Sequence, residues 1–181
     1  MEAILATDIN FGISKDGKIP WKSKKDMSFF FNKTKNNVVI MGKTTYFSLP
    51  EQFRPLKDRL NIVLTSNPHP YMNDTQYIYP NLIFTDDDTV NFNVHQNREK
   101  LMELYPFLSS NFKIFIIGGK QIYEKYISLC STVWVTTIKK NYSCDLFFDY
   151  DYKQQFKEEL VEEDDELKIV EWKKISNKFY I

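Results

Sequence analysis

Cysteine and histidine are scarce in this sequence. Its 181 residues include two cysteines, Cys130 and Cys144, which are too far apart for a Cys-x-x-Cys pair and too few for a disulfide framework. The two histidines, His69 and His95, add too little to make a zinc site expected. We therefore expect two reduced thiols and no bound metal.

The sequence also lacks an excess of charge and any long apolar run. Its 24 Lys and Arg residues balance 24 Asp and Glu residues, so the cationic excess typical of a nucleic-acid-binding protein is missing. No apolar run approaches the roughly 20 residues that a membrane-spanning helix needs. No basic segment precedes the first apolar stretch, as it would in a signal peptide. We expect a cytoplasmic protein without a nucleic-acid or membrane partner.

Apolar residues are plentiful enough for one hydrophobic core. They make up 43% of the chain, which excludes disorder, and the length fits a single domain, residues 1–181. Helical patterns start at Asp26, Lys43 and Gln121 and span residues 94–105. Apolar runs typical of buried strands alternate with them, at residues 3–6, 38–41, 61–64, 113–117 and 133–138. Because residues 156–181 alternate like antiparallel edge strands, the pattern predicts an α/β fold with a mixed, mostly parallel sheet and an antiparallel C-terminal edge.

Glycine is rare as well, so each of the five glycines is expected where a side chain does not fit. They lie in the first long loop or at the carboxyl ends of strands, where open α/β sheets bind ligands. The segment Gly42-Lys43-Thr44-Thr45 places backbone N–H groups, two hydroxyls and a cation at a helix start, which suits a phosphate. Residues 118–120 (Gly-Gly-Lys) repeat this arrangement. Either junction alone could simply relieve crowding in a turn, but together they favour one extended ligand that bridges both.

Four segments of the chain resemble the dihydrofolate reductases, in order and at the expected spacing over nearly the whole length. They read GISKDGKIPWKSKKDM, VVIMGKTTYFSLPEQFRPLKDRLNIVLTS, IFIIGGKQIYEKY and VWVTTIKKNYSCDLFF. The resemblance implies an eight-stranded sheet with about four helices, NADPH as hydride donor and 7,8-dihydrofolate as substrate. It also implies a role in one-carbon metabolism and thymidylate synthesis, and a target for antifolates. We expect a monomer, unless the natural chain continues past Ile181 into a fused thymidylate synthase or associates with one.

Asp26 is the only carboxylate between Asp16 and Glu51. From the residues alone it reads best as a helix N-cap, because Asp before an apolar helical run satisfies free N–H groups. The resemblance instead makes Asp26 the active-site acid and Trp21 its catalytic neighbour in the loop that closes over the nicotinamide. Burial beside Met27 and Trp21 should favour the neutral acid. By this reading Asp26 orients the pterin ring and promotes protonation of N5, while water delivers the proton.

Arg59 resembles the arginine that grips the glutamate carboxylate of the substrate, for which a planar guanidinium is suited. The alternative is a surface salt bridge. The remaining substrate-binding residues follow from the resemblance alone: Ile4, Met27, Phe30, Leu56, Ile117, Tyr123 and Thr136.

The cofactor residues also follow from the resemblance. The nicotinamide side comprises Ala6, Gly12, Ile13, Gly17 and Lys18. The phosphate side comprises Gly42, Lys43, Thr44, Thr45, Thr65, Ser66, Asn67, Gly118, Gly119, Lys120, Gln121 and Ile122. The peptide bond between Gly118 and Gly119 is cis in the family. Where many relatives carry an arginine after the third strand, this chain reads Thr65-Ser66-Asn67, and Gln121 is uncharged. We therefore expect Lys43 to carry most of the recognition of the ribose 2′-phosphate, with Lys120 as its rival.

Two other functions remain open at this point. One is a catalytically silent pterin- or nucleotide-binding protein, against which Asp26, Trp21 and Arg59 argue. The other is a reductase of the riboflavin pathway, which would not need Arg59 for a glutamate tail.

Overall fold

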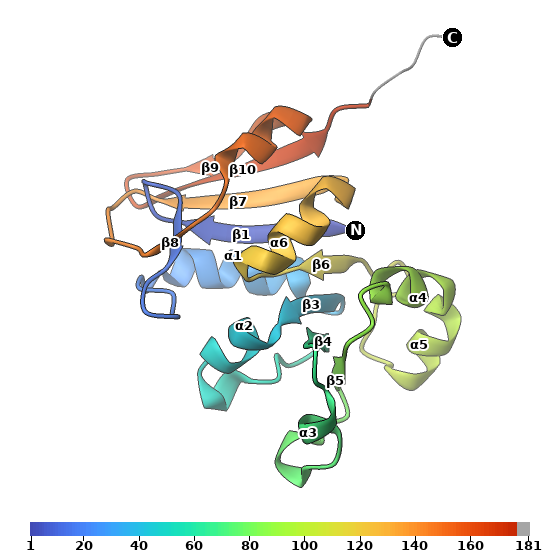
Figure 1. The fold of residues 1–181 in the computed structure, drawn as a ribbon. Helices are drawn as coiled ribbons and strands as arrows, with labels where there is room; N and C mark the ends of the chain where they lie inside the picture. Colours follow the sequence, from blue (N-terminus) through green and yellow to red (C-terminus); the bar gives the residue numbers. More distant parts are fainter. Residues whose placement is uncertain (177–181) are drawn as a thin grey trace.

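An eight-stranded β-sheet runs through the molecule, with helices on both faces (Figure 1), as predicted. The computed structural model describes residues 1–176, so the expected strand end at residues 179–181 lies outside the described residues. The strand order is β5-β4-β3-β6-β1-β7-β10-β9. The strands are β1 (Glu2–Thr7), β3 (Val38–Gly42), β4 (Leu60–Leu64), β5 (Leu82–Thr85), β6 (Ile114–Ile116), β7 (Thr132–Ile138), β9 (Phe156–Glu163) and β10 (Leu167–Lys174).

The direction of the strands matches the prediction. All pairs from β5 to β7 are parallel, whereas β10 runs antiparallel to both β7 and β9. Two short strands, β2 (Gly12–Ser14) and β8 (Leu146–Phe147), form a separate antiparallel pair that the sequence did not predict. This pair ties the loop after β1 to the loop after β7, and both loops lie at the carboxyl edge of the sheet.

Four α-helices of the described chain have seven residues or more: α1 (Lys24–Thr34), α4 (Val90–Gln96), α5 (Arg98–Leu104) and α6 (Lys120–Tyr126). The shorter helices are α2 (Lys43–Ser48) and α3 (His69–Met72), and the 3₁₀ turns are η1 (Glu51–Phe53), η2 (Thr75–Tyr77), η3 (Ile127–Leu129) and η4 (Tyr150–Gln155).

The prediction of one continuous helix over residues 94–105 was wrong. Asn97 ends α4 and precedes α5, with φ −110° and ψ 25°. Its side-chain amide donates to the carbonyl of Asn93 at 2.7 Å. Asparagine competes with the helix for backbone hydrogen bonds in this way, and the periodic apolar pattern does not register that competition.

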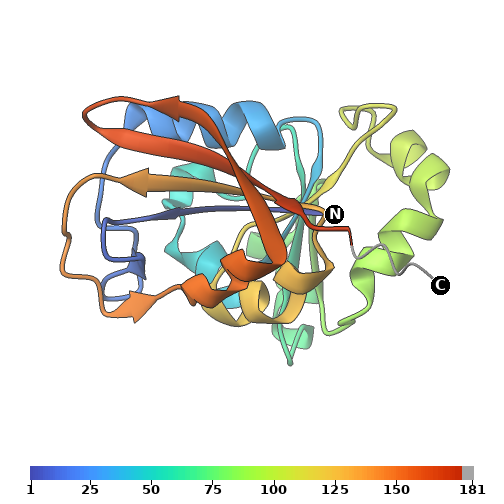
Figure 2. The ribbon, with the colours of Figure 1, turned by 90° about the horizontal axis from the view of Figure 1, so that it is seen from above.

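Strand residues alternate between two apolar layers, one on each face of the sheet. Val38 and Ile40 pack into the layer that includes α4 and α6, whereas Val39 and Met41 pack into the layer beneath α1 and α2. Seen from above, α1 and α6 lie on opposite sides of the strands (Figure 2). Burial on both faces explains why these strands read as continuous apolar runs.

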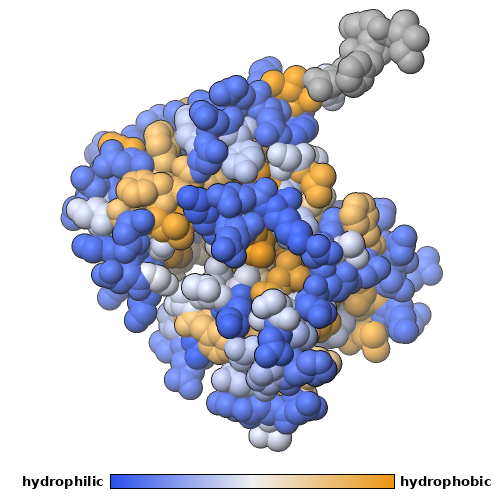
Figure 3. All heavy atoms as spheres, in the orientation of Figure 1, coloured by the Kyte–Doolittle hydropathy of each residue, from blue (hydrophilic) through white to orange (hydrophobic). Residues whose placement is uncertain are grey.

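Hydrophilic residues cover most of the face seen in Figure 1, with smaller apolar patches between them (Figure 3). Within residues 1–176, no helix has the length and apolar character needed to cross a membrane. No group of three or more His, Cys, Asp or Glu side chains in this part of the chain is placed to hold a metal ion.

Candidate active site

Asp26 lies in the first turn of α1 and is not its N-cap, so that prediction was wrong. Ser23 caps the helix: its hydroxyl accepts a hydrogen bond from the backbone N–H of Asp26 at 3.2 Å. Serine and aspartate are both good caps, and a helix needs only one. Because Ser23 takes that role three residues before the predicted cap, the Asp26 carboxyl is free for other contacts.

The Asp26 carboxyl lies between α1 and the sheet. Burial raises the pKa of this carboxyl, and the negative charge of Glu166 adds to the shift. The Thr136 hydroxyl on β7 and the Trp21 indole face the carboxyl and lower its pKa, but burial outweighs them. The structure thus brings Asp26, Trp21 and Thr136 together, and it holds Asp26 closer to neutrality than an exposed aspartate.

Trp21 is buried in the loop between β2 and α1. Its ring packs with Ile138, Cys144, Leu167 and Ile169 at the end of the sheet. The indole nitrogen faces the Asp26 carboxyl but forms no hydrogen bond with it or with any other described residue, although it is fully enclosed. A buried N–H without a partner costs free energy, so this donor suits a site that a polar ligand or solvent completes.

The floor of the site comes from three neighbouring strands. Ile4 on β1 accepts a hydrogen bond from the Tyr123 hydroxyl at 2.9 Å through its carbonyl. Burial, and to a lesser degree the charge of Asp26, raises the pKa of Tyr123, which therefore stays neutral. Ile117 follows β6 and packs in the same apolar layer as Ile4, while Thr136 pairs with Ala6 across β7 and β1.

Arg59 is 5% exposed and forms no ion pair within the described chain. Its Nε donates to the Lys57 carbonyl at 2.9 Å, and its Nη1 donates to the Thr34 hydroxyl at 3.1 Å. Burial lowers the pKa of the guanidinium to about 10, so it remains charged at neutral pH. These contacts exclude the surface salt bridge and leave guanidinium N–H groups available for an anion.

The apolar substrate residues differ in burial. Leu56 is buried, and its backbone N–H donates to Asn61 Oδ1 at 2.9 Å. Phe30 is half-buried, with its ring 5.8 Å from the Arg59 guanidinium. Met27 is exposed and belongs to no apolar cluster of the described residues, and its place in the wall of the substrate site stays a prediction.

The two strand-glycine-helix junctions meet, because β3 and β6 are neighbours. The backbone N–H of Gly42 donates to the carbonyl of Gly118 at 2.9 Å. A Cβ on Gly42 would lie 3.2 Å from Ile122 Cγ1, and one on Gly119 would lie 3.2 Å from Thr45 Oγ1. Gly42 and Gly119 are the N-caps of α2 and α6, and neither helix has a side-chain cap, so the backbone N–H groups at both starts stay available.

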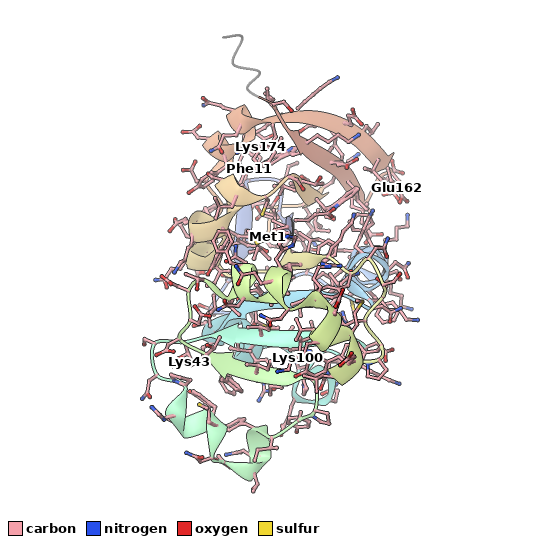
Figure 4. The ribbon with its side chains drawn as sticks, turned by 90° about the vertical axis from the view of Figure 1, so that its right-hand side faces the viewer. Met1, Phe11, Lys43, Lys100, Glu162 and Lys174 are labelled. Atoms are coloured by element: carbon pink, nitrogen blue, oxygen red, sulfur yellow. The ribbon has the colours of Figure 1, made fainter. Side chains whose placement is uncertain are left out.

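Cations and hydroxyls surround these junctions. Lys43 is exposed at the start of α2 (Figure 4) and has no ion-pair partner within residues 1–176, whereas Lys120 Nζ lies 3.9 Å from Glu124 Oε1. Residues 65–67 continue β4 at the same edge, with the Ser66 and Asn67 side chains exposed. Thr44 is exposed beside Lys43, and Gln121 is exposed one residue after Lys120.

The loop after β1 brings Gly12 and Ile13 into β2, next to β8. A Cβ on Gly12 would lie 2.3 Å from Cys144 Cβ, so only glycine fits there. The loop then turns through Gly17, and Lys15 and Lys18 form an isolated antiparallel bridge.

Sequence reasoning missed Asp8, which is fully buried in this loop. Its carboxylate accepts from the backbone N–H groups of Asn10 and Gly12 at 2.9 Å and of Tyr142 at 3.1 Å. Burial would raise the pKa of Asp8, but these hydrogen bonds hold it below its usual value. An aspartate four residues before a glycine at a strand end was the available signal.

Comparison with known proteins decides the family. A family model described as dihydrofolate reductase matches residues 1–175. The chain belongs to the dihydrofolate reductase family. Its cis peptide bond between Gly118 and Gly119 agrees with the one expected from the resemblance. Members of this family are enzymes that reduce dihydrofolate with a nicotinamide cofactor.

Individual dihydrofolate reductases are similar over most of the chain. The dihydrofolate reductase of Heliothis virescens is 32% identical over 176 residues, which cover 91% of this chain and 85% of that protein. That of Drosophila melanogaster is 32% identical over 154 residues, or 80% and 76% of the two chains. The bifunctional dihydrofolate reductase-thymidylate synthase of Daucus carota is 36% identical over 155 residues, which cover 81% of this chain but 27% of that protein.

Proposed function

We propose that this chain reduces 7,8-dihydrofolate to 5,6,7,8-tetrahydrofolate with NADPH, by hydride transfer to C6 and protonation of N5. One observation carries the proposal: a half-buried carboxyl, Asp26, faces Trp21 and Thr136 on the same side of the sheet as Arg59, a buried arginine without a carboxylate partner among residues 1–176. The two charged groups suit the two polar ends of a folate. The product would supply one-carbon metabolism and thymidylate synthesis.

Asp26 holds the pterin ring in this proposal. Its carboxyl accepts from the N–H donors of the ring, while the carbonyls of Ile4 and Ile117 and the Thr136 hydroxyl complete the polar contacts. Because burial raises the pKa of Asp26, a proton is retained near N5 at a pH where an exposed carboxyl would have lost it. Water delivers the proton that N5 takes up.

Arg59 binds the glutamate carboxylate of the substrate. Its Nε and Nη1 hydrogen bonds to Lys57 and Thr34 fix the plane of the guanidinium before the ligand arrives. A fixed fork binds a carboxylate through two parallel hydrogen bonds and loses little conformational freedom. Phe30 and Leu56 flank this end of the site and suit the aminobenzoyl ring.

The residues present fit NADPH. A Cβ on Gly42, Gly118 or Gly119 would lie 3.2 Å from the side chain of Ile122, Tyr123 or Thr45, respectively, so little room remains there for a side chain. Two helix starts without a side-chain cap lie beside these glycines. These groups would hold the phosphates, with Lys43 on the ribose 2′-phosphate, while Ala6, Ile13 and Trp21 border the nicotinamide. When bound, NADPH supplies the hydride.

The test is the loss of NADPH absorbance when dihydrofolate is added to the purified chain, with NADPH alone as the control. A silent binding protein would bind both ligands without turnover, and a riboflavin-pathway reductase would turn over a pyrimidine substrate but not dihydrofolate. Either result would overturn the proposal. We further propose that the chain is a cytoplasmic monomer. Size-exclusion chromatography tests the oligomeric state. The alternative to a separate chain is a fusion like that of the bifunctional relatives.

A further inference from the structure

The turn between β9 and β10 lies beside the first turn of α1, although the two segments are far apart in the sequence. Figure 2 shows the tip of this hairpin next to the start of α1, and Figure 4 shows Glu162 at the end of the hairpin opposite to Lys174. The turn itself comprises Asp164, Asp165 and Glu166. The active-site acid therefore has a neighbour that the proposed function does not use.

Two hydrogen bonds in series connect this turn to Asp26. The Ser23 hydroxyl donates to Glu166 Oε1 at 2.5 Å, across 143 residues of sequence. The same Ser23 oxygen accepts from the backbone N–H of Asp26 at 3.2 Å. Ser23 is 4% exposed, so its hydroxyl has little competing contact with water. Glu166 thus orients the very oxygen that caps the helix carrying Asp26.

A second contact fixes the turn against α1. Lys25 forms an ion pair and hydrogen bond with Asp164 Oδ2. Asp164 Oδ1 in turn accepts from the backbone N–H groups of Glu166 at 2.8 Å and Leu167 at 3.0 Å. The carbonyl of Glu166 accepts from the Lys139 N–H at 2.9 Å. Both the backbone and the side chain of Glu166 are therefore held in place.

Leu167, the first residue of β10, reaches the site as well. Leu167 is fully buried and packs in the same cluster as Trp21 and Ile138. The hairpin end therefore contacts both members of the catalytic pair: Leu167 packs beside the Trp21 ring, and Glu166 reaches the cap of the Asp26 helix. A displacement of the turn would move both.

We propose that Glu166 is a positioning residue, which fixes the Asp26 carboxyl against Thr136 and Trp21 by holding Ser23 as the cap of α1. This role rests on the proposed function. It requires only that Glu166 accept a hydrogen bond, since the geometry passes through the Ser23 hydroxyl.

The charge of Glu166 has a separate effect. It raises the pKa of Asp26 in addition to the larger effect of burial. The other charged group on α1 that faces the turn, Lys25, is paired with Asp164, and Tyr123 on the opposite side of Asp26 is neutral. Loss of the Glu166 charge should therefore lower the pKa of Asp26, so that turnover declines at a lower pH.

The experiment compares Glu166→Ala, Glu166→Gln and Asp165→Ala. Asp165→Ala is the matched control, because it removes an exposed carboxylate from the same turn that has no hydrogen bond within the described residues. We expect Glu166→Ala to lower kcat about two- to tenfold, the effect of one lost hydrogen bond, with KM for NADPH unchanged. Glu166→Gln keeps the acceptor and should restore kcat at its pH optimum, while its pH profile moves to lower pH. Asp165→Ala should change neither.

Amide hydrogen exchange gives a readout that does not depend on turnover. The Asp26 N–H should exchange faster in Glu166→Ala and in Ser23→Ala than in Asp165→Ala, and the double variant should add little to either single one. Equal kcat, pH profile and exchange in Glu166→Ala and Asp165→Ala would overturn the positioning role, as would equal losses in the Ala and Gln variants. If Asp26→Asn retains full turnover at neutral pH, it is the proposed function of Asp26 that fails.

Discussion

The backbone N–H of Gly42 donates to the carbonyl of Gly118 at 2.9 Å, across the neighbouring strands β3 and β6. This bond places the starts of α2 and α6 side by side at the carboxyl edge of the sheet. Two short motifs, 76 positions apart in the sequence (118 − 42), thus become one surface. In the function proposed here, a single extended cofactor spans both.

Asp26→Asn should lower kcat about 10²- to 10⁴-fold at neutral pH, the usual effect of losing a catalytic acid or base. Partial recovery is expected at low pH, where the substrate is already protonated. The measurement is the pH dependence of kcat with saturating NADPH. Asp16→Asn, which replaces an exposed carboxylate in the same region, is the control and should match the wild type. An unchanged rate at pH 7 would remove Asp26 from the mechanism.

The same variant should be more stable than the wild type at neutral pH. Burial raises the pKa of Asp26, so the folded state binds a proton more tightly than the unfolded chain does. Such a group contributes stability below its unfolded pKa and loses that contribution as pH rises through its folded pKa. Melting temperatures of the two proteins should therefore differ at pH 7 and converge near pH 3 to 4, around the ordinary pKa of aspartate. A wild type that melts higher than Asp26→Asn at pH 7 would contradict this sign.

Arg59→Lys should raise KM for dihydrofolate far more than KM for NADPH. Lysine keeps the charge but loses the planar fork, at a cost of roughly 1.5 to 3 kcal/mol, or about 10- to 150-fold. Arg54→Lys is a matched control, because Arg54 donates to the carbonyls of Phe47 and Leu49 and has no proposed ligand contact. Equal effects of Arg59→Lys on both Michaelis constants would show that Arg59 is structural.

Lys43→Ala should remove most of the preference for NADPH over NADH. Lys43 has no ion-pair partner in the described chain, and one charge-assisted contact contributes roughly 1.5 to 3 kcal/mol, or about 10- to 150-fold. The ratio of kcat/KM for the two cofactors measures this, and in the wild type it should fall as added salt screens the exposed charge. Lys120→Ala is the comparison: if only that change collapses the ratio, Lys120 binds the 2′-phosphate.

Gly118→Ala should destabilise the fold, by roughly 1 to 3 kcal/mol. The φ of Gly118 is +115°, where side chains are strained, and the added Cβ would lie 3.2 Å from the Tyr123 hydroxyl. Gly17→Ala is the control, since Gly17 also has a positive φ but its Cβ would meet nothing within 4 Å. Chemical denaturation of both variants gives the difference. A Gly118→Ala protein as stable as Gly17→Ala would show that the close contact with Tyr123 is relieved without cost.

The layers of the fold could be predicted from the sequence because a strand that is buried on both faces is a continuous apolar run. Val38 to Met41 are all apolar, and a strand with that pattern fits only between two layers. The same reasoning could not separate Ser23 from Asp26 as the helix cap, since both residue types suit the position. It also could not find Glu166, whose contact with Ser23 leaves no periodic signal and spans 143 residues. The break between α4 and α5 at Asn97 was not predicted, because the apolar spacing continues through it as in one unbroken helix.

The central place of β1 in the sheet has a consequence for the nascent chain. Glu2 pairs with Phe115 on β6 and with Thr132 on β7, so β1 leaves the ribosome well before either of its neighbours has been synthesised. Until then Ala3, Ile4 and Leu5 remain without their partner strands. Contacts so distant in sequence slow folding, and they expose an apolar segment to aggregation or chaperone capture during synthesis. The strand at the centre of the finished molecule is thus among the last to be secured.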